Sequence, residues 1–209
     1  MKKRLLQSLV VVLVGFNVVV GFRVYNALGA TEKDDTGYAS IAVFARALQL
    51  IRQDYVDEGK VSYEELTHAA MRGPSAWPVA ERELMAAYVS KVNDCPFCIG
   101  AHTATASLAA GNEVSVAAAL ADLELAPVGE GLRATLRMLG KLTRDGNLSA
   151  DDVRRVLDTG VSRQQVEDAL AICYAFNVTN RLANAFGFEV MNQEGFQAGA
   201  KYLLRRGYR

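Results

Sequence analysis

The apolar residues between Pro74 and the C-terminus recur at helical spacing, and no useful run alternates in the way of a half-buried strand. The pattern predicts helices over 79–92, 95–110, 114–123, 129–145 and 162–186, one more after the N-terminal signal Ser149-Ala-Asp-Asp152, and a last one before Gly207. We therefore expect an all-α helical bundle, and the hydrophobic fraction of 51% in 209 residues is enough to bury a core.

The first 29 residues have the layout of a targeting segment. Three cations, Lys2-Lys3-Arg4, precede a largely apolar run from Leu5 to Phe22. A run of about 18 residues is near the minimum for a spanning helix, and Ala27-Leu-Gly29 offers small residues for cleavage. We expect a membrane anchor with the basic end cytoplasmic and the domain outside the cytoplasm, or a secreted or periplasmic chain after cleavage, with a slight preference for the anchor.

Residues 30–73 are predicted to form a polar linker and a helical prefix. Ser62 and Glu65 make a capping box before the second of two helical patterns. The stretches Val43–Asp57, Tyr63-Glu-Glu-Leu66 and Ala70-Met-Arg-Gly73 resemble the N-terminal lead-in of carboxy-terminal processing peptidases. The catalytic domain of those peptidases is absent from the remaining sequence, so we infer no protease activity. The alternative is that these are the first helices of the following domain, residues 74–209.

The charge and the cysteine content limit the possible partners and the possible uses of the cysteines. The 23 basic and 23 acidic residues cancel, so the composition does not indicate a nucleic-acid partner. Of three cysteines, only Cys95-Pro-Phe-Cys98 form a close pair, which indicates redox chemistry or metal binding rather than a disulfide scaffold. Cys173 lies in an apolar helical run, where a free cysteine packs as a small hydrophobic residue.

The Cys95–Cys98 pair is predicted to lie at a helix N-terminus. Asn93-Asp94 ends the preceding helix, and Pro96 occupies an early position where its missing N–H costs nothing. The helix dipole and unpaired amides at such a position lower a thiol pKa. His102 follows Cys98 by four residues, so both side chains lie on one helix face and can exchange a proton.

A carboxylate on the preceding helix could orient His102. If the two helices form an antiparallel hairpin, Glu83 reaches the imidazole and completes a Glu, His and Cys relay. Periodicity alone allows Glu81 equally well.

The stretch Glu83-Leu-Met-Ala-Ala-Tyr-Val-Ser-Lys-Val-Asn-Asp-Cys-Pro-Phe-Cys-Ile-Gly-Ala-His102 resembles the motif of the alkylhydroperoxidase D-like branch of the carboxymuconolactone decarboxylase family. The resemblance extends roughly from residue 72 to the C-terminus. It implies that Cys98 attacks the peroxide, Cys95 resolves it as a disulfide, and Glu83 and His102 carry the proton.

Two further positions bear on the resemblance. Asn177-Val-Thr-Asn-Arg181 matches an Asn-Arg pair in a late helix of the family, where Asn180 or Arg181 would support the core or an oligomer interface. Pro96 and Phe97 stand where active members can carry a histidine, which leaves the strength of thiol activation open.

The resemblance predicts a thiol-dependent peroxidase with a hydroperoxide substrate, an unidentified thiol or disulfide electron donor, no cofactor and a homo-oligomeric state. Disulfide exchange is nearly as well supported, because an oxidising compartment keeps such a pair as a disulfide. Four other interpretations of the motif and its domain remain. The pair could form a structural disulfide, the domain could be a lactone decarboxylase, or the fold could be thioredoxin-like. The fourth is a zinc site formed by Cys95, Cys98 and His102 with Glu83 or Asp94.

Overall fold

The computed structural model describes residues 62–208, which form eight α-helices and no strand. The helices are α3 (Tyr63–Arg72), α4 (Val79–Val92), α5 (Pro96–Ala110), α6 (Glu113–Ala121), α7 (Glu130–Asp145), α8 (Ala150–Leu157), α9 (Arg163–Ala185) and α10 (Gln193–Arg206). The predicted all-α class is confirmed for this part of the chain. The anchor predicted over residues 1–29 and the linker before Ser62 lie outside the described residues.

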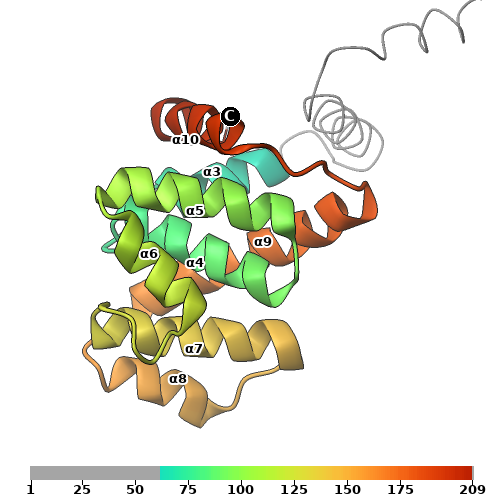
Figure 1. The fold of residues 1–209 in the computed structure, drawn as a ribbon. Helices are drawn as coiled ribbons and strands as arrows, with labels where there is room; N and C mark the ends of the chain where they lie inside the picture. The colour runs from blue at the N-terminus through green and yellow to red at the C-terminus, as the bar shows by residue number, and fades with distance from the viewer. Residues whose placement is uncertain (1–61, 209) are drawn as a thin grey trace, which may run out of the picture. The chain divides into compact units, whose positions relative to one another are not determined.

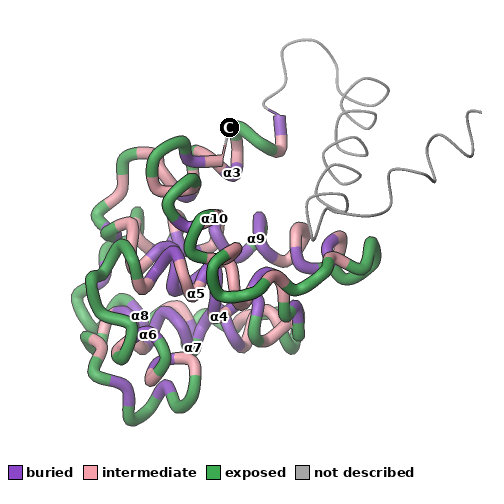
Figure 2. Tube along the Cα trace, turned by 45° about the horizontal axis from the view of Figure 1, so that its top comes forward, coloured by how far each residue is buried: buried purple, intermediate pink, exposed green. Residues whose placement is uncertain are grey.

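The middle of the bundle is α4, which packs against α5, α7 and α9 (Figure 1). Its central residues are apolar nearly all round, so most of the helix is buried: Leu84, Met85, Ala86, Ala87 and Val89. One face of α9 is buried against it, and the core continues into α7 (Figure 2). The two helices that carry the predicted site, α4 and α5, are therefore held from several sides.

Two helices from opposite ends of the described chain cover this centre. The first, α3, packs on α9, and the last, α10, packs on α5 (Figure 1). The boundary predicted between residues 73 and 74 thus falls between two helices, α3 and α4, that contact each other. No helix between residues 62 and 208 combines the length and apolarity that a membrane crossing requires.

Three helices begin with a capping box, and the signals at Ser62 and Ser149 were predicted. Ser62 with Glu65, Ser149 with Asp152 and Ser162 with Gln165 each form a capping box, in which the two side chains satisfy each other's backbone amides. The predicted range 79–92 is that of α4. The helix predicted over 114–123 begins at Glu113 because Asn112 caps it, and it ends at Ala121.

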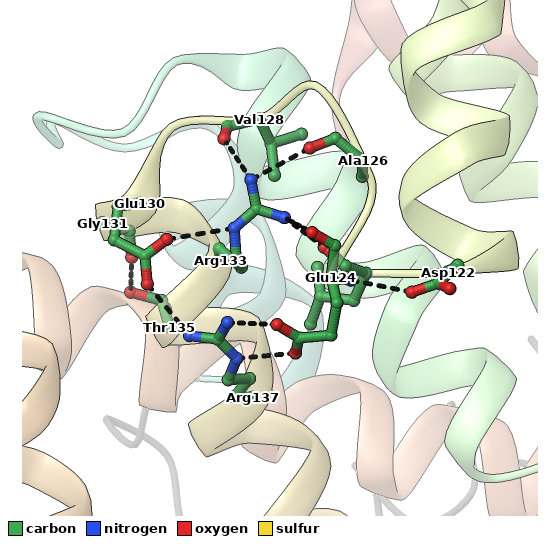
Figure 3. Close-up of polar contacts among 10 residues, drawn as sticks. Asp122, Glu124, Ala126, Val128, Glu130, Gly131, Arg133, Thr135 and Arg137 are labelled. Atoms are coloured by element: carbon green, nitrogen blue, oxygen red, sulfur yellow. Dashed lines mark hydrogen bonds and ion pairs between the residues drawn. The ribbon is translucent and has the colours of Figure 1, made fainter.

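The loop between α6 and α7 is fixed by two arginines of α7 (Figure 3). Arg133 donates to four carbonyl oxygens of the loop, those of Leu123, Glu124, Ala126 and Val128. Arg137 pairs with Glu124 and Glu130. A guanidinium group with several donors in one plane can hydrogen-bond several carbonyl oxygens of a turn at once.

Candidate redox site

The site is built on the hairpin of α4 and α5, whose turn is Asn93-Asp94. Asp94 adopts a left-handed conformation, with φ of 49°, which Asn and Asp tolerate better than most residues. The amide of Cys95 donates to the Ser90 carbonyl at 3.0 Å and closes the turn. The predicted helix break at Asn93-Asp94 is therefore present.

The far end of α9 braces this turn with amide side chains. Asn184 donates from Nδ2 to the carbonyl oxygen of Asp94 at 3.1 Å, and Asn93 donates to Oδ1 of Asn177 at 3.1 Å. These contacts fix the position from which α5 starts. The cysteines at the start of α5 are thus placed by a long-range network as well as by the local turn.

Cys95 and Cys98 lie at the start of α5, as the sequence predicted. Cys95 is the N-cap residue and Cys98 lies in the first turn. Both are free thiols with exposed fractions of only 1% and 2%, and they pack with Ala183, Phe97 and Phe188. The rings of Phe97 and Phe188 meet edge to face, with centroids 5.2 Å apart. The dithiol is therefore covered by an apolar, largely aromatic layer.

The two thiols interact, and the interaction shifts their pKa values in opposite directions. The hydrogen bond from Cys98 lowers the pKa of Cys95 and outweighs burial, which acts in the opposite direction. The same hydrogen bond raises the pKa of Cys98, and burial and the neighbouring charge raise it further. The pair therefore loses its two protons in separate steps, and the second loss is opposed by the first. In this arrangement Cys95 is the more acidic thiol of the two.

Glu83 and His102 form the pair that the hairpin was expected to create. His102 Nδ1 lies 2.8 Å from Oε2 of Glu83, and their exposed fractions are 5% and 0%. Glu83, and not Glu81, is thus the carboxylate that contacts His102. An ionised carboxylate accepts, so the proton lies on Nδ1 and leaves Nε2 available as a base. His102 follows Cys98 by one helical turn, on the same face of α5.

Glu83 is held ionised by Arg72 and by the hydrogen bond from His102. Burial opposes its ionisation, but the hydrogen bond and electrostatic interaction with His102, together with the charge and hydrogen bond of Arg72, outweigh burial and lower the pKa of Glu83. Arg72 Nη2, at the end of α3, lies 2.6 Å from Oε1 of Glu83. Arg72 was not among the predicted site residues, because it belongs to the segment that was interpreted as a prefix.

Tyr208, in the chain's last two residues, also reaches the site and was not predicted. Its hydroxyl lies 3.0 Å from both carboxylate oxygens of Glu83 and 3.4 Å from His102 Nδ1. No motif in the sequence indicated this contact, since 125 residues separate the two partners. The only available signal was a tyrosine directly after the glycine that ends the last helix.

Asn180 and Arg181 of α9, the predicted Asn-Arg pair, lie in different surroundings. Asn180 is fully buried, and its Oδ1 lies 3.1 Å from the hydroxyl of Ser90 in α4. Arg181 is exposed and donates to the carbonyl oxygen of Asn177 within its own helix. Asn180 therefore contributes to the core contact between α9 and α4.

Metal binding by the same residues was a second interpretation of the motif. Across residues 62–208, no three or more His, Cys, Asp or Glu side chains are grouped so that they could hold a metal ion. The predicted ligand set of Cys95, Cys98 and His102 with Glu83 or Asp94 is not assembled in this arrangement.

Comparison with known proteins agrees with this architecture. Residues 62–141, from α3 into α7, match the sequence profile of the carboxymuconolactone decarboxylase family. This region is a carboxymuconolactone decarboxylase family domain. It includes the α4–α5 hairpin with Glu83, both cysteines of the pair and His102. The match begins at Ser62, so α3 belongs to the matched region, and the peptidase resemblance of residues 1–73 receives no support.

Solved structures similar to the chain share this fold. An uncharacterized peroxidase-related protein from Silicibacter sp. TM1040 is 21% identical, with a TM-score of 0.59 over 75% of this chain and 87% of that chain. A second uncharacterized peroxidase-related protein, an alkylhydroperoxidase AhpD core from Ralstonia eutropha JMP134, is 23% identical, with a TM-score of 0.60 over 66% and 73%. No curated protein matches the chain. At these identities, the likeness to the two solved structures concerns the fold alone.

Proposed function

We propose that this protein is a thiol-dependent oxidoreductase that reduces hydroperoxides through Cys95 and Cys98. The observation that carries the proposal is the 2.8 Å contact between Glu83 and His102, formed in the core one helical turn from a buried dithiol. A glutamate without such a partner would lie in solvent, because burying an unpaired carboxylate is costly. A carboxylate that fixes an imidazole beside a thiol is the arrangement that proton transfer to and from sulfur requires.

The reaction balances with the residues present and one external donor. His102 takes the proton of Cys98, and the thiolate attacks the terminal peroxide oxygen. The O–O bond breaks, Cys98 becomes a sulfenic acid, and the alkoxide takes the proton back from His102 to leave as an alcohol. Cys95 then attacks the Cys98 sulfur, which forms the disulfide and releases water. The dithiol has lost the two electrons that the hydroperoxide gained, and a thiol donor must return them.

A second function, dithiol–disulfide exchange, is favoured by the charge distribution within the pair. The hydrogen bond from Cys98 lowers the pKa of Cys95, so Cys95 is the better nucleophile in the resting structure. In exchange, Cys95 would attack a partner disulfide and Cys98 would release it. The two functions therefore assign the first attack to different sulfurs.

The partners and location follow the same proposal. We infer that the electron donor is a thiol protein or small thiol, that the chain assembles as a homo-oligomer, and that the N-terminal segment directs it to a membrane with the domain outside the cytoplasm, as an anchor or before cleavage.

Single-turnover oxidation tests the proposal. The reduced full-length chain is mixed with an alkyl hydroperoxide, and free thiols are counted against time in the wild type, Cys98→Ser, Cys95→Ser and His102→Gln. We expect two thiols to disappear in the wild type and His102→Gln to react about 100-fold more slowly. Cys95→Ser should stop at a sulfenic acid, which a dimedone probe traps on Cys98.

The same variants separate the alternatives. If Cys95 reacts with a model disulfide while neither thiol reacts with the hydroperoxide, disulfide exchange is the better account. Thiols inert to both reagents would leave a structural disulfide. Cys173→Ala is the matched control, since it removes a buried thiol that lies outside the pair.

A further inference from the structure

The carboxylate of Glu83 is approached by three donors from three separate segments. Arg72 of α3 contacts Oε1, His102 of α5 contacts Oε2, and the Tyr208 hydroxyl lies 3.0 Å from both oxygens. A hydroxyl placed in the fork of a carboxylate fixes the rotation of that group about its last bond. The orientation of Oε2 toward His102 thus depends on Tyr208.

Tyr208 is held in place by contacts on every part of the residue. Its backbone N–H donates to Nδ1 of His68 at 3.2 Å, its ring meets Phe176 edge to face at 6.2 Å, and Arg72 lies 5.1 Å above the ring centroid. The preceding Gly207 has φ of 71°, and a Cβ there would lie 2.5 Å from Cε1 of His68. Only glycine allows α10 to end in this way.

The hydroxyl is suited to donate rather than accept. Burial and the negative charge of Glu83 raise the pKa of Tyr208 well above its ordinary value, so the phenol keeps its proton. Without that proton donor, the carboxylate could turn both oxygens toward the guanidinium of Arg72, in the bidentate geometry that arginine favours. The hydrogen bond to His102 would then weaken.

We propose that Tyr208 is a positioning residue of the relay, which orients the Glu83 carboxylate so that His102 keeps its proton on Nδ1 and presents Nε2 for proton exchange. This inference rests on the proposed function in one respect, namely that the exchange serves the dithiol. It also makes the segment that follows α10 part of the site. The matched region that ends at residue 141 therefore does not contain the whole site.

Two measurements on the full-length chain test this role. The variant Tyr208→Phe keeps the ring and removes the hydroxyl, and Tyr202→Phe removes an exposed hydroxyl from α10 as the matched control. The first measurement is the rate of thiol loss with an alkyl hydroperoxide. We expect Tyr208→Phe to react about tenfold more slowly, the factor that corresponds to the loss of one hydrogen bond to a charged group, and Tyr202→Phe to react like the wild type.

The second measurement does not depend on peroxide. The chain has two histidines, so ¹⁵N-histidine labelling gives few imidazole signals, and a His102→Gln spectrum assigns them. We expect the wild type to show the Nδ1–H tautomer at His102 and Tyr208→Phe to show a mixture of tautomers. Unchanged nitrogen shifts in Tyr208→Phe would overturn the positioning role, whatever the rate. A wild type that ignores hydroperoxides would defeat the proposed function alone, and the nitrogen shifts would still decide the role of Tyr208.

Discussion

A Cβ atom on Gly100 of α5 would lie 2.3 Å from Cζ of Phe196 in α10, closer than any side-chain contact allows. The ring of Phe196 therefore rests directly on the backbone of α5, within two residues of Cys98, and also lies 6.1 Å from the ring of Phe97. Through Phe196, α10 therefore packs against Phe97, one of the rings that cover the dithiol, and we take this contact as part of the cover. Because the cysteines are only 1% and 2% exposed, we expect a hydroperoxide or partner to reach the sulfurs when this cover moves.

Gly100→Ala should loosen this cover. The added methyl must displace the ring of Phe196, and overpacking of this kind costs about 1–3 kcal/mol, so α10 should open more often. We expect iodoacetamide to alkylate Cys95 and Cys98 about tenfold faster, the factor that corresponds to about 1.4 kcal/mol. The matched control is Gly199→Ala, whose Cβ would find its nearest neighbour, Met191, at 3.9 Å. Equal alkylation rates in both variants would show that α10 does not limit access.

Cys173→Ala should leave the redox chemistry unchanged. Burial raises the pKa of the Cys173 thiol, and Thr143 and Asn177 satisfy it, so it is a poor nucleophile. We expect excess hydroperoxide to consume two thiols in the folded wild type, and Cys173→Ala to lose two at the same rate. Titration with Ellman's reagent before and after denaturation counts the third thiol. Loss of three thiols from the folded chain would contradict this assignment.

The sequence determined the helices well because their signals are local. Ser62, Ser149 and Ser162 each stand three residues before a side chain that completes a capping box, and such pairs depend only on neighbours in the chain. The break at Asn93-Asp94 and the proline after Cys95 likewise placed both thiols at the start of α5.

The contacts of Glu83 were predictable only in part. Glu81 and Glu83 are two residues apart on one helix, and only the packing of α4 against α5 selects Glu83 for His102. Arg72, at the end of α3, and Tyr208, just after α10, reach the carboxylate through packing that no local pattern specifies. A hydrophobic pattern can indicate that such a residue is buried, but it does not identify the distant residue that it contacts.

Arg133→Ala should destabilise the fold through the loop between α6 and α7. Its guanidinium satisfies carbonyl oxygens from Leu123 to Val128, and buried acceptors left without partners cost about 1–3 kcal/mol each. Because water can reach part of this loop, we expect a loss of about 2 kcal/mol in the free energy of unfolding, measured with urea. Arg154→Ala removes an exposed pair with Asp151 and should cost under about 1 kcal/mol. Equal losses in the two variants would show that the carbonyl contacts contribute little.

Glu83→Gln should remove an acid-dependent part of the stability. Because the folded pKa of Glu83 lies below its ordinary value of 4.5, its ionised form stabilises the fold above that pH, and this contribution is lost as the pH falls below it. At pH 7 the variant should lose about 3 kcal/mol, since Arg72 keeps a buried charge without its partner, and its stability should fall less than that of the wild type between about pH 5 and pH 3. Urea unfolding across that range measures both effects.

Glu81→Gln is the matched comparison. Burial raises the pKa of Glu81, so the contribution of Glu81 to the free energy of unfolding is present at low pH and is lost as the pH rises. Parallel pH profiles for the wild type and Glu83→Gln would mean that Glu83 is not held ionised by Arg72 and His102.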